Sequence, residues 1–303
     1  MPQGLTIGQI RERVRRARRW QEHSRLVYEV LHSSAKEDFQ YLVDVYRETL
    51  QQTPTPLVRW AFADLGMEIR SYNINRSDKY GITLEAVRKL WDTPRSFEEL
   101  RRVVRESPHS VIGYMGLARA YRTLPGNDPE IAKYERVIGE RTIIVEIDGK
   151  KIPQKAIEVD NPEQSRRYRM YMDKVKALDP LNPYLSYWEA DRLYAYLGGY
   201  KRVVENLLHY TEQQLAKLSK EAIALEGLKH AKAAYENGFK EFSPIVALGS
   251  IIHFAYLANR QNEMKRWGEV LKPLINENPQ SPYVAWLRAA YSHSCPYIKM
   301  LTR

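Results

Sequence analysis

The sequence predicts an all-α protein, a solenoid of antiparallel helix pairs with one small β-hairpin inserted. Apolar residues recur with helical periodicity along most of the 303 residues. Four junctions share one form, in which a helix ends at a proline and a helix bearing an aromatic residue follows. β-Branched residues flank Asp148-Gly149, which is a strong hairpin signal. These three observations favour packed helices along the whole chain, interrupted by a single β-hairpin.

Composition excludes several classes of protein. Aliphatic and aromatic residues make up 44% of the chain together with cysteine, which is ample for a core. The single cysteine, Cys295, excludes an internal disulfide framework. No apolar run approaches the roughly 20 residues that span a bilayer, and no signal-peptide core is evident. We therefore expect a cytoplasmic protein.

The first elements follow from periodicity and capping boxes. An Arg-rich N-terminal helix is expected within residues 1–35, because apolar residues form a stripe among the arginines. A capping box at Ser34 predicts a helix over about 36–51, and a second box at Ser96 predicts one over about 97–106. Residues 36–303 should form a single irregular helical array.

Two later segments are irregular. Residues 142–152 predict a β-hairpin, whose second arm should end at Pro153, within an insertion near 139–160. Residues 201–237 lack proline throughout and lack glycine as far as Gly227, which predicts one long helix there.

The four junctions organise the array. Each begins with a proline that stops one helix, and the next helix carries an aromatic six or seven residues later. The prolines and their aromatics are Pro54 and Trp60, Pro108 and Tyr114, Pro180 and Tyr187, and Pro279 and Trp286. Each junction therefore predicts a stop followed by a start.

The spacing inside these helices resembles the tetratricopeptide repeat (TPR), a unit of about 34 residues made of two antiparallel helices. Its characteristic steps are occupied at Pro108, Tyr114, Leu117, Ala118 and Tyr121, and again at Tyr187, Ala190 and Tyr194. The junction prolines are separated by 54, 72 and 99 residues, which are not multiples of the repeat. The resemblance implies stacked helix pairs with a concave binding surface.

The TPR resemblance also places residues on that concave surface. They are Met115, Arg119, Arg122, Trp188, Arg192, Tyr196, Tyr256, Arg260 and Tyr291. Aromatic residues and arginine are enriched at binding hot spots. Trp188 and Arg192, one helical turn apart, should form an exposed anchor, with Tyr187 packed inside. The alternative is that irregular repeats shift this register and bury part of the set.

A basic patch marks the N-terminus, where seven arginines and two glutamates give residues 1–25 half of the net charge of +10. Its members are Arg11, Arg13, Arg15, Arg16, Arg18, Arg19 and Arg25. The patch could contact phosphates or an acidic protein surface. Alternatively, it is the solvated face of a helix that caps the array.

The sequence contains no recognisable catalytic, phosphate-binding or metal-binding motif. There is no glycine-rich phosphate loop, and the seven histidines form no i, i+4 pair. His293 and Cys295 lie two residues apart, which points their side chains away from one another on a helix. We therefore predict no catalytic residues, no metal site and no cofactor.

The function predicted from sequence is a non-catalytic scaffold or adaptor. Its concave aromatic and arginine surface would bind another protein, through an acidic or aromatic segment, within a larger assembly. Three alternatives stay open: a nucleic-acid-associated protein that uses the basic N-terminal helix, an amphipathic contact with a membrane surface, and an enzyme whose site is not visible in the sequence.

Overall fold

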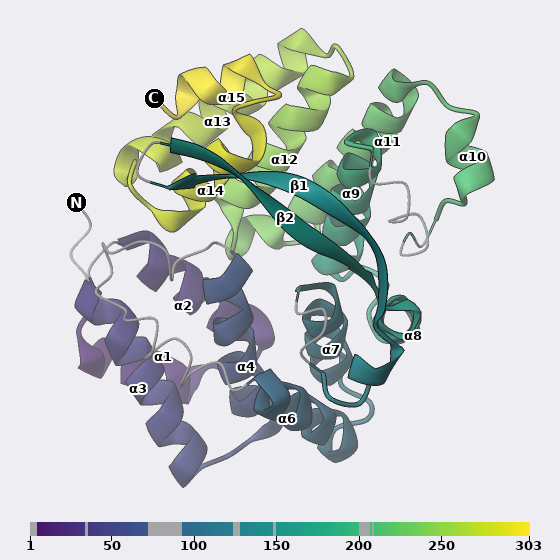
Figure 1. Cartoon of the computed structure of the whole chain (residues 1–303). Helices are drawn as coiled ribbons and strands as arrows, with labels where there is room; N and C mark the ends of the chain where they lie inside the picture. Colours follow the sequence, from purple (N-terminus) through teal and green to yellow (C-terminus); the bar gives the residue numbers. More distant parts are fainter. Residues whose placement is uncertain are drawn as a thin grey trace.

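The computed structural model describes residues 5–33, 36–71, 93–123, 128–147, 150–199, 207 and 209–303. Within these ranges the chain is mainly helical, neighbouring helices pack on one another, and one two-stranded sheet is inserted (Figure 1). Helical character with a small hairpin is thereby confirmed. None of the described helices combines the length and the apolar character needed to cross a membrane.

The elements of the first half precede and include the hairpin. They are α1 (Ile7–Arg16), α2 (Trp20–Ser33), α3 (Lys36–Gln52), α4 (Pro56–Ser71), α6 (Thr93–Glu106), α7 (Val111–Thr123), the 3₁₀ turn η3 (Ala132–Tyr134), β1 (Arg136–Ile147) and β2 (Lys150–Asp160).

The second half is helical wherever it is described. Its elements are α8 (Pro162–Leu178), α9 (Pro183–Leu197), α10 (Glu212–Ala216), α11 (Lys220–Glu236), the 3₁₀ turn η5 (Phe239–Glu241), α12 (Pro244–Leu257), α13 (Gln261–Glu277), α14 (Pro282–Tyr291) and α15 (Pro296–Leu301).

Local sequence explains where many of these helices begin. At all four predicted junctions one helix stops, and α4, α7, α9 and α14 begin within a few residues. Proline occupies the first turn of α8, α9, α12, α14 and α15, where its missing N–H costs no hydrogen bond. Side-chain oxygens of Thr6, Asn161, Asn182, Thr211, Ser219 and Ser281 accept hydrogen bonds from the first-turn amides of the helices that follow them.

Two predicted helix boundaries are wrong. Helix α6 begins at Thr93, so Ser96 lies inside it and does not open it. The segment 201–237 is broken, because α10 ends at Ala216 and Ser219 caps the start of α11. The Ser219 side chain hydrogen-bonds to the backbone, which favours the start of a helix over its interior. Residues 201–206 and 208 of that segment, and Ser34 of the predicted capping box, lie outside the described residues.

The hairpin is longer than predicted. Strands β1 and β2 are antiparallel, with Ile147 paired to Lys150 across the turn, while Asp148-Gly149 itself lies outside the described residues. Pro153 does not end the second arm; it pairs with Ile144 and the strand continues to Asp160. A two-stranded sheet has two open edges, so a proline can face outward without breaking the ladder.

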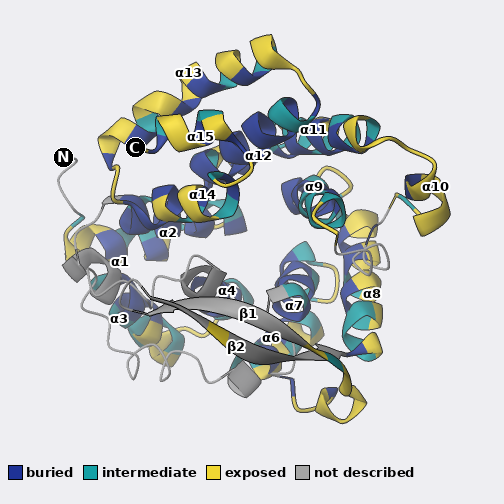
Figure 2. Ribbon diagram, turned by 45° about the horizontal axis from the view of Figure 1, so that its top comes forward, coloured by how far each residue is buried: buried dark blue, intermediate teal, exposed yellow. Residues whose placement is uncertain are grey.

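Helix α2 joins the beginning of the chain to its end. The Tyr28 and Tyr283 rings lie 4.7 Å apart, and His32 Nδ1 shares a hydrogen bond of 2.9 Å with Ser281 Oγ. The Asn278 amide also donates to the His32 carbonyl oxygen. Figure 2 shows α2 beside α14, although about 250 residues separate them in sequence. This contact packs the N-terminal helices against the C-terminal ones.

Aromatic rings fill the interior where the two halves meet. Trp20 of α2 contacts Trp60 at 6.1 Å, Tyr184 at 5.7 Å and Phe242 at 5.2 Å between ring centroids. These rings come from α4, α9 and the segment after η5, and all four are buried. Such pairs add stability beyond their buried area. Trp20 therefore ties the N-terminal helices to both halves of the molecule.

One buried histidine lies in this aromatic interior. His253 of α12 is packed against the rings of Tyr194, Phe254 and Tyr291, and neither of its ring nitrogens has a hydrogen-bond partner among the described residues. Burial lowers its pKa to about 4, because the charged imidazolium is poorly solvated there. His253 is therefore neutral in the folded protein at neutral pH.

We expect His253→Phe to protect the protein from acid. Below about pH 6.5 the unfolded chain binds a proton at this position, whereas the folded protein does not until about pH 4, so wild-type stability falls as the pH falls. The phenylalanine variant lacks this linkage and should gain ~2 kcal/mol over wild type at pH 5, relative to their difference at pH 7.5. Urea denaturation at both pH values measures this; equal changes for the two proteins would contradict it.

Candidate functional site

A cavity of about 250 Å³ lies where helices of both halves meet. Helices α2, α4, α7, α9 and α14 and the η5 segment line it. Its charged lining residues are Asp64, Arg119, Arg122, Asp191 and Arg192. The remaining lining residues are Ser24, Val27, Tyr184, Tyr187, Trp188, Phe239, Phe242, Ser243 and Trp286. We call this space the arginine cavity.

Two ion pairs organise its charges. Arg119 Nη1 lies 2.6 Å from Asp64 Oδ1, with both side chains only 7% exposed. Arg122 Nη2 lies 2.6 Å from Asp191 Oδ2, and Arg192 Nε lies 4.0 Å from the same oxygen, beyond hydrogen-bond distance. Three guanidinium groups thus face two carboxylates, an excess of one positive charge around a partly enclosed space.

Electrostatics keep these groups ionised. Burial opposes the charge of Arg122, but attraction to Asp191 outweighs it, and the pKa of Arg122 is raised. Burial likewise opposes ionisation of Asp191, but Arg122 and Arg192 outweigh it, and the pKa of Asp191 is lowered. Arg122 and Asp191 therefore both stay charged across the physiological pH range.

Two guanidinium nitrogens of the cavity residues lack a hydrogen-bond partner within the described part of the chain. The Nε atoms of Arg122 and Arg192 are buried and have no hydrogen-bond partner among the described residues. Aromatic rings support the guanidinium groups, with Arg122 5.9 Å from the Tyr187 ring centroid and Arg192 5.9 Å from that of Tyr168. A buried donor without a partner costs free energy.

The arrangement suits binding of an anion. Guanidinium groups recognise carboxylates and phosphates through paired N–H donors. The described lining contains no histidine, cysteine or lysine that could act as a base or nucleophile near neutral pH. Its two carboxylates are already paired with arginines. The described lining therefore presents charged groups that are fixed by ion pairs.

The structure brings together four of the residues predicted to be concave. Arg119, Arg122, Trp188 and Arg192 all line the arginine cavity. The exposure predicted for Trp188 is wrong, since its side chain is 1% exposed and packs against Tyr184 at 5.0 Å between ring centroids. Helix α9 is covered on more than one side, so a residue off its main packing stripe is still buried.

The other predicted concave residues lie away from the cavity lining. Met115 and Tyr291 are buried, which contradicts a surface role: Met115 Sδ accepts a hydrogen bond from Asn182 at 3.7 Å, and Tyr291 packs on His253. Tyr196 and Tyr256 are half-buried, and Arg260 is exposed at the start of α13. Tight packing of α12 and α14 removes Tyr291 from solvent.

The basic N-terminal patch is largely paired with carboxylates. The pairs are Arg11 with Glu48, Arg13 and Arg25 with Glu29, Arg15 and Arg16 with Glu12, and Arg19 with Glu22, while Arg18 donates to the carbonyl oxygen of Arg15. The patch spans two helices, since Arg11, Arg13, Arg15 and Arg16 belong to α1, Arg18 and Arg19 follow it, and Arg25 belongs to α2. Ile10 and Val14 of α1 are buried.

Ten of the fourteen described lining residues were not predicted as site residues, and three of them matter most. Asp64 and Asp191 supply its carboxylates, and Trp286, predicted only as a junction aromatic, forms part of the wall. A signal existed for Asp191, because it directly precedes Arg192 in sequence. Nothing in the sequence pairs Asp64 with Arg119, 55 residues away.

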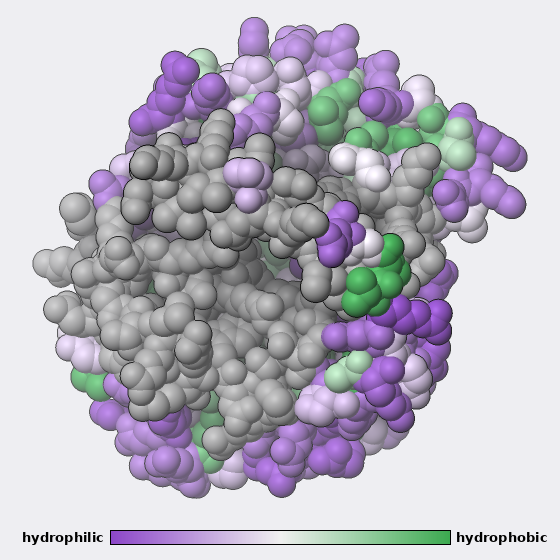
Figure 3. Space-filling view, viewed as in Figure 1, coloured by the Kyte–Doolittle hydropathy of each residue, from purple (hydrophilic) through white to green (hydrophobic). Residues whose placement is uncertain are grey.

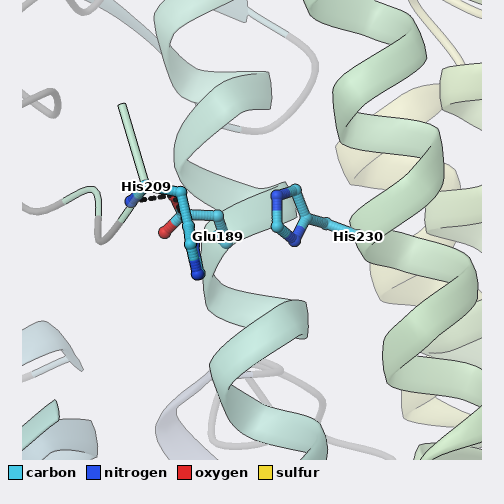
Figure 4. A group of neighbouring side chains, drawn as sticks. All are labelled: Glu189, His209 and His230. Carbon is cyan, nitrogen blue, oxygen red and sulfur yellow. Dashed lines mark hydrogen bonds and ion pairs between the residues drawn. The ribbon is translucent and has the colours of Figure 1, made fainter. Parts of the chain in front are cut away.

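A second polar group lies outside the cavity lining. Glu189, His209 and His230 offer one ligand atom each, and these atoms all lie within 4.8 Å of one another (Figure 4). The sequence predicted no metal site because these residues are 20 and 21 positions apart, far from the spacing of a local motif.

Exposed apolar side chains form no large patch on the described part of the face in Figure 3. On the face in Figure 3 the coloured surface is mostly hydrophilic, with small and separate apolar patches. Exposed apolar side chains such as Val137, Leu181 and Met300 are scattered over the described residues. Single exposed apolar side chains are normal on soluble proteins. The arginine cavity, in contrast, gathers charged and aromatic side chains in one place.

Comparison with known proteins found no matching family model, no matching curated protein and no matching solved structure. The role of each residue in the candidate sites is therefore inferred from its geometry and chemistry.

Proposed function

We propose that this protein is a non-catalytic binding protein that receives an acidic group of a partner protein in the arginine cavity. The observation that carries this proposal is the convergence of Arg119, Arg122 and Arg192 on a space to which the described lining residues contribute two carboxylates. A third carboxylate, brought by a partner, would balance the charge. Buried arginines surrounded by aromatic rings are typical of binding hot spots.

A tetratricopeptide-like arrangement fits this function. In our proposal the helix pairs form a short array that curls until α2 meets α14, and the arginine cavity is its concave side. The cavity residues Arg119, Arg122, Trp188 and Arg192 are four of the nine that the repeat spacing assigns to that side. Such a protein would act as a scaffold or adaptor that recognises one feature of its partner.

The dimensions suggest what that feature is. A cavity of about 250 Å³ is smaller than the ~300–1,000 Å³ typical of small-molecule sites. It suits one or two side chains. The aromatic wall of Tyr187, Trp188 and Trp286 favours an acidic residue next to an aromatic one.

The proposal is tested with a short peptide. The probe is an acetylated and amidated Glu-Tyr-Asp peptide, titrated by calorimetry beside its neutral Gln-Tyr-Asn counterpart. We expect wild type to bind the acidic peptide at least tenfold more tightly, because a hydrogen bond to a charged group contributes ~1.5–3 kcal/mol. Arg192→Gln should remove most of that preference.

Arg105→Gln is the matched control, since Arg105 is exposed on α6 and lies outside the cavity lining. It should bind like wild type. Equal affinity of wild type for the two peptides, or equal loss in both variants, would contradict the proposal. Tight, steeply salt-dependent binding of single-stranded polyuridylate instead would favour the nucleic-acid alternative.

A further inference from the structure

Three polar side chains from different elements point toward one another on the side of α9 seen in Figure 4. Glu189 belongs to α9, His209 precedes α10, and His230 belongs to α11. Glu189 is buried, His230 is half-buried, and the side chain of His209 is 41% exposed. Two imidazoles and one carboxylate are a common set of protein ligands for a transition metal.

The distances are close to those of a bound ion. His209 Nδ1 lies 3.3 Å from Glu189 Oε1. Bonds of ~2.0–2.2 Å at a tetrahedral angle place neighbouring ligand atoms roughly 3.4 Å apart. All three ligand atoms lie within 4.8 Å of one another, and the His209 side chain is exposed.

The neighbouring Tyr210 hydroxyl determines which ring nitrogen of neutral His230 carries the hydrogen. The Tyr210 hydroxyl donates its hydrogen to Glu226 Oε2 at 2.6 Å and also lies 3.3 Å from His230 Nε2. Since the hydroxyl hydrogen is used, Tyr210 accepts from His230 Nε2–H. Neutral His230 therefore carries its lone pair on Nδ1. Metal-binding histidines commonly donate their second nitrogen in this way.

We propose that Glu189, His209 and His230 form a binding site for a divalent transition-metal ion of the zinc class. The mixture of nitrogen and oxygen ligands disfavours calcium and magnesium, which prefer oxygen alone. Three protein ligands leave a fourth position for water or another group, on the side where His209 is exposed. The ion would join α9, α11 and the segment before α10.

The test uses the full chain, dialysed against a chelator and titrated with ZnCl₂ by calorimetry and with CoCl₂ by visible absorption. We expect one ion per chain. Glu189→Gln and His209→Ala should each weaken binding by at least 100-fold, since even outer partners of a metal site typically contribute ~10–100-fold. Tyr210→Phe should weaken it about tenfold, because His230 loses its acceptor.

His109→Ala is the control, because His109 is exposed on a distant loop; it should bind like wild type. His209→Ala changes a partly exposed residue and should fold normally, so the test stays decisive if Glu189→Gln does not fold. ZnCl₂ should also raise the melting temperature of wild type but not of His209→Ala. Absence of saturable binding at micromolar zinc, or wild-type affinity in His209→Ala, would overturn the proposal.

Discussion

Trp188→Ala is expected to destabilise the protein by ~3–5 kcal/mol, as truncation of a large buried aromatic does. The Trp188 side chain is 1% exposed and packs against Tyr184 and Tyr168, at 5.0 and 6.2 Å between ring centroids. Removing the indole would enlarge the arginine cavity, and its walls would lose their contacts. The loss should appear as a lower urea midpoint with little change in slope.

Leu181→Ala is the control for this experiment, because Leu181 is exposed in the turn before α9. Exposed substitutions usually change stability by less than about 0.5 kcal/mol. If Trp188→Ala behaves like Leu181→Ala, then Trp188 is exposed in solution, as its repeat position alone had predicted.

Asp64→Asn is expected to cost ~3–5 kcal/mol, the usual effect of removing one member of a buried ion pair. The substitution keeps the shape of the side chain but removes the charge that faces Arg119 at 2.6 Å. Three guanidinium groups would then face Asp191 alone within the cavity lining. Because the cavity would carry a larger excess of positive charge, an added anion should restore part of the stability.

The measurement compares urea unfolding of Asp64→Asn and wild type with and without 50 millimolar sulfate at constant ionic strength. The variant should regain stability with sulfate and wild type should gain less, because binding to the folded state alone stabilises it. Glu12→Gln is the control: Glu12 pairs with exposed arginines of α1, and such pairs contribute ~0–1 kcal/mol. An equal sulfate effect in all three proteins would contradict an anion-binding cavity.

Signals that act within a few residues were predicted well. The four proline junctions precede α4, α7, α9 and α14, because a proline cannot continue a helix. The paired runs around Asp148-Gly149 form β1 and β2. One local error concerns the start of α6. Ser96 has the sequence pattern of an N-cap, yet the helix already begins at Thr93.

The candidate site was only partly predictable. Repeat spacing identified Arg119, Arg122, Trp188 and Arg192, and the structure brings them together. It did not identify Asp64, whose pairing with Arg119 depends on how α4 packs against α7. The exposure of Trp188 was wrong because helical periodicity distinguishes one packed stripe from the rest, whereas α9 is covered by α8, α11 and α12.

The sequence by itself determined helical character, the helix starts at the junctions and the presence of one hairpin, because each depends on dihedral preferences and hydrogen bonds within a few residues. Only the tertiary structure decided the closure of α2 on α14, the arginine cavity and the convergence of Glu189, His209 and His230. Those features join residues from about 20 to about 250 positions apart. Their contacts depend on how helices pack, and packing is a property of the whole chain.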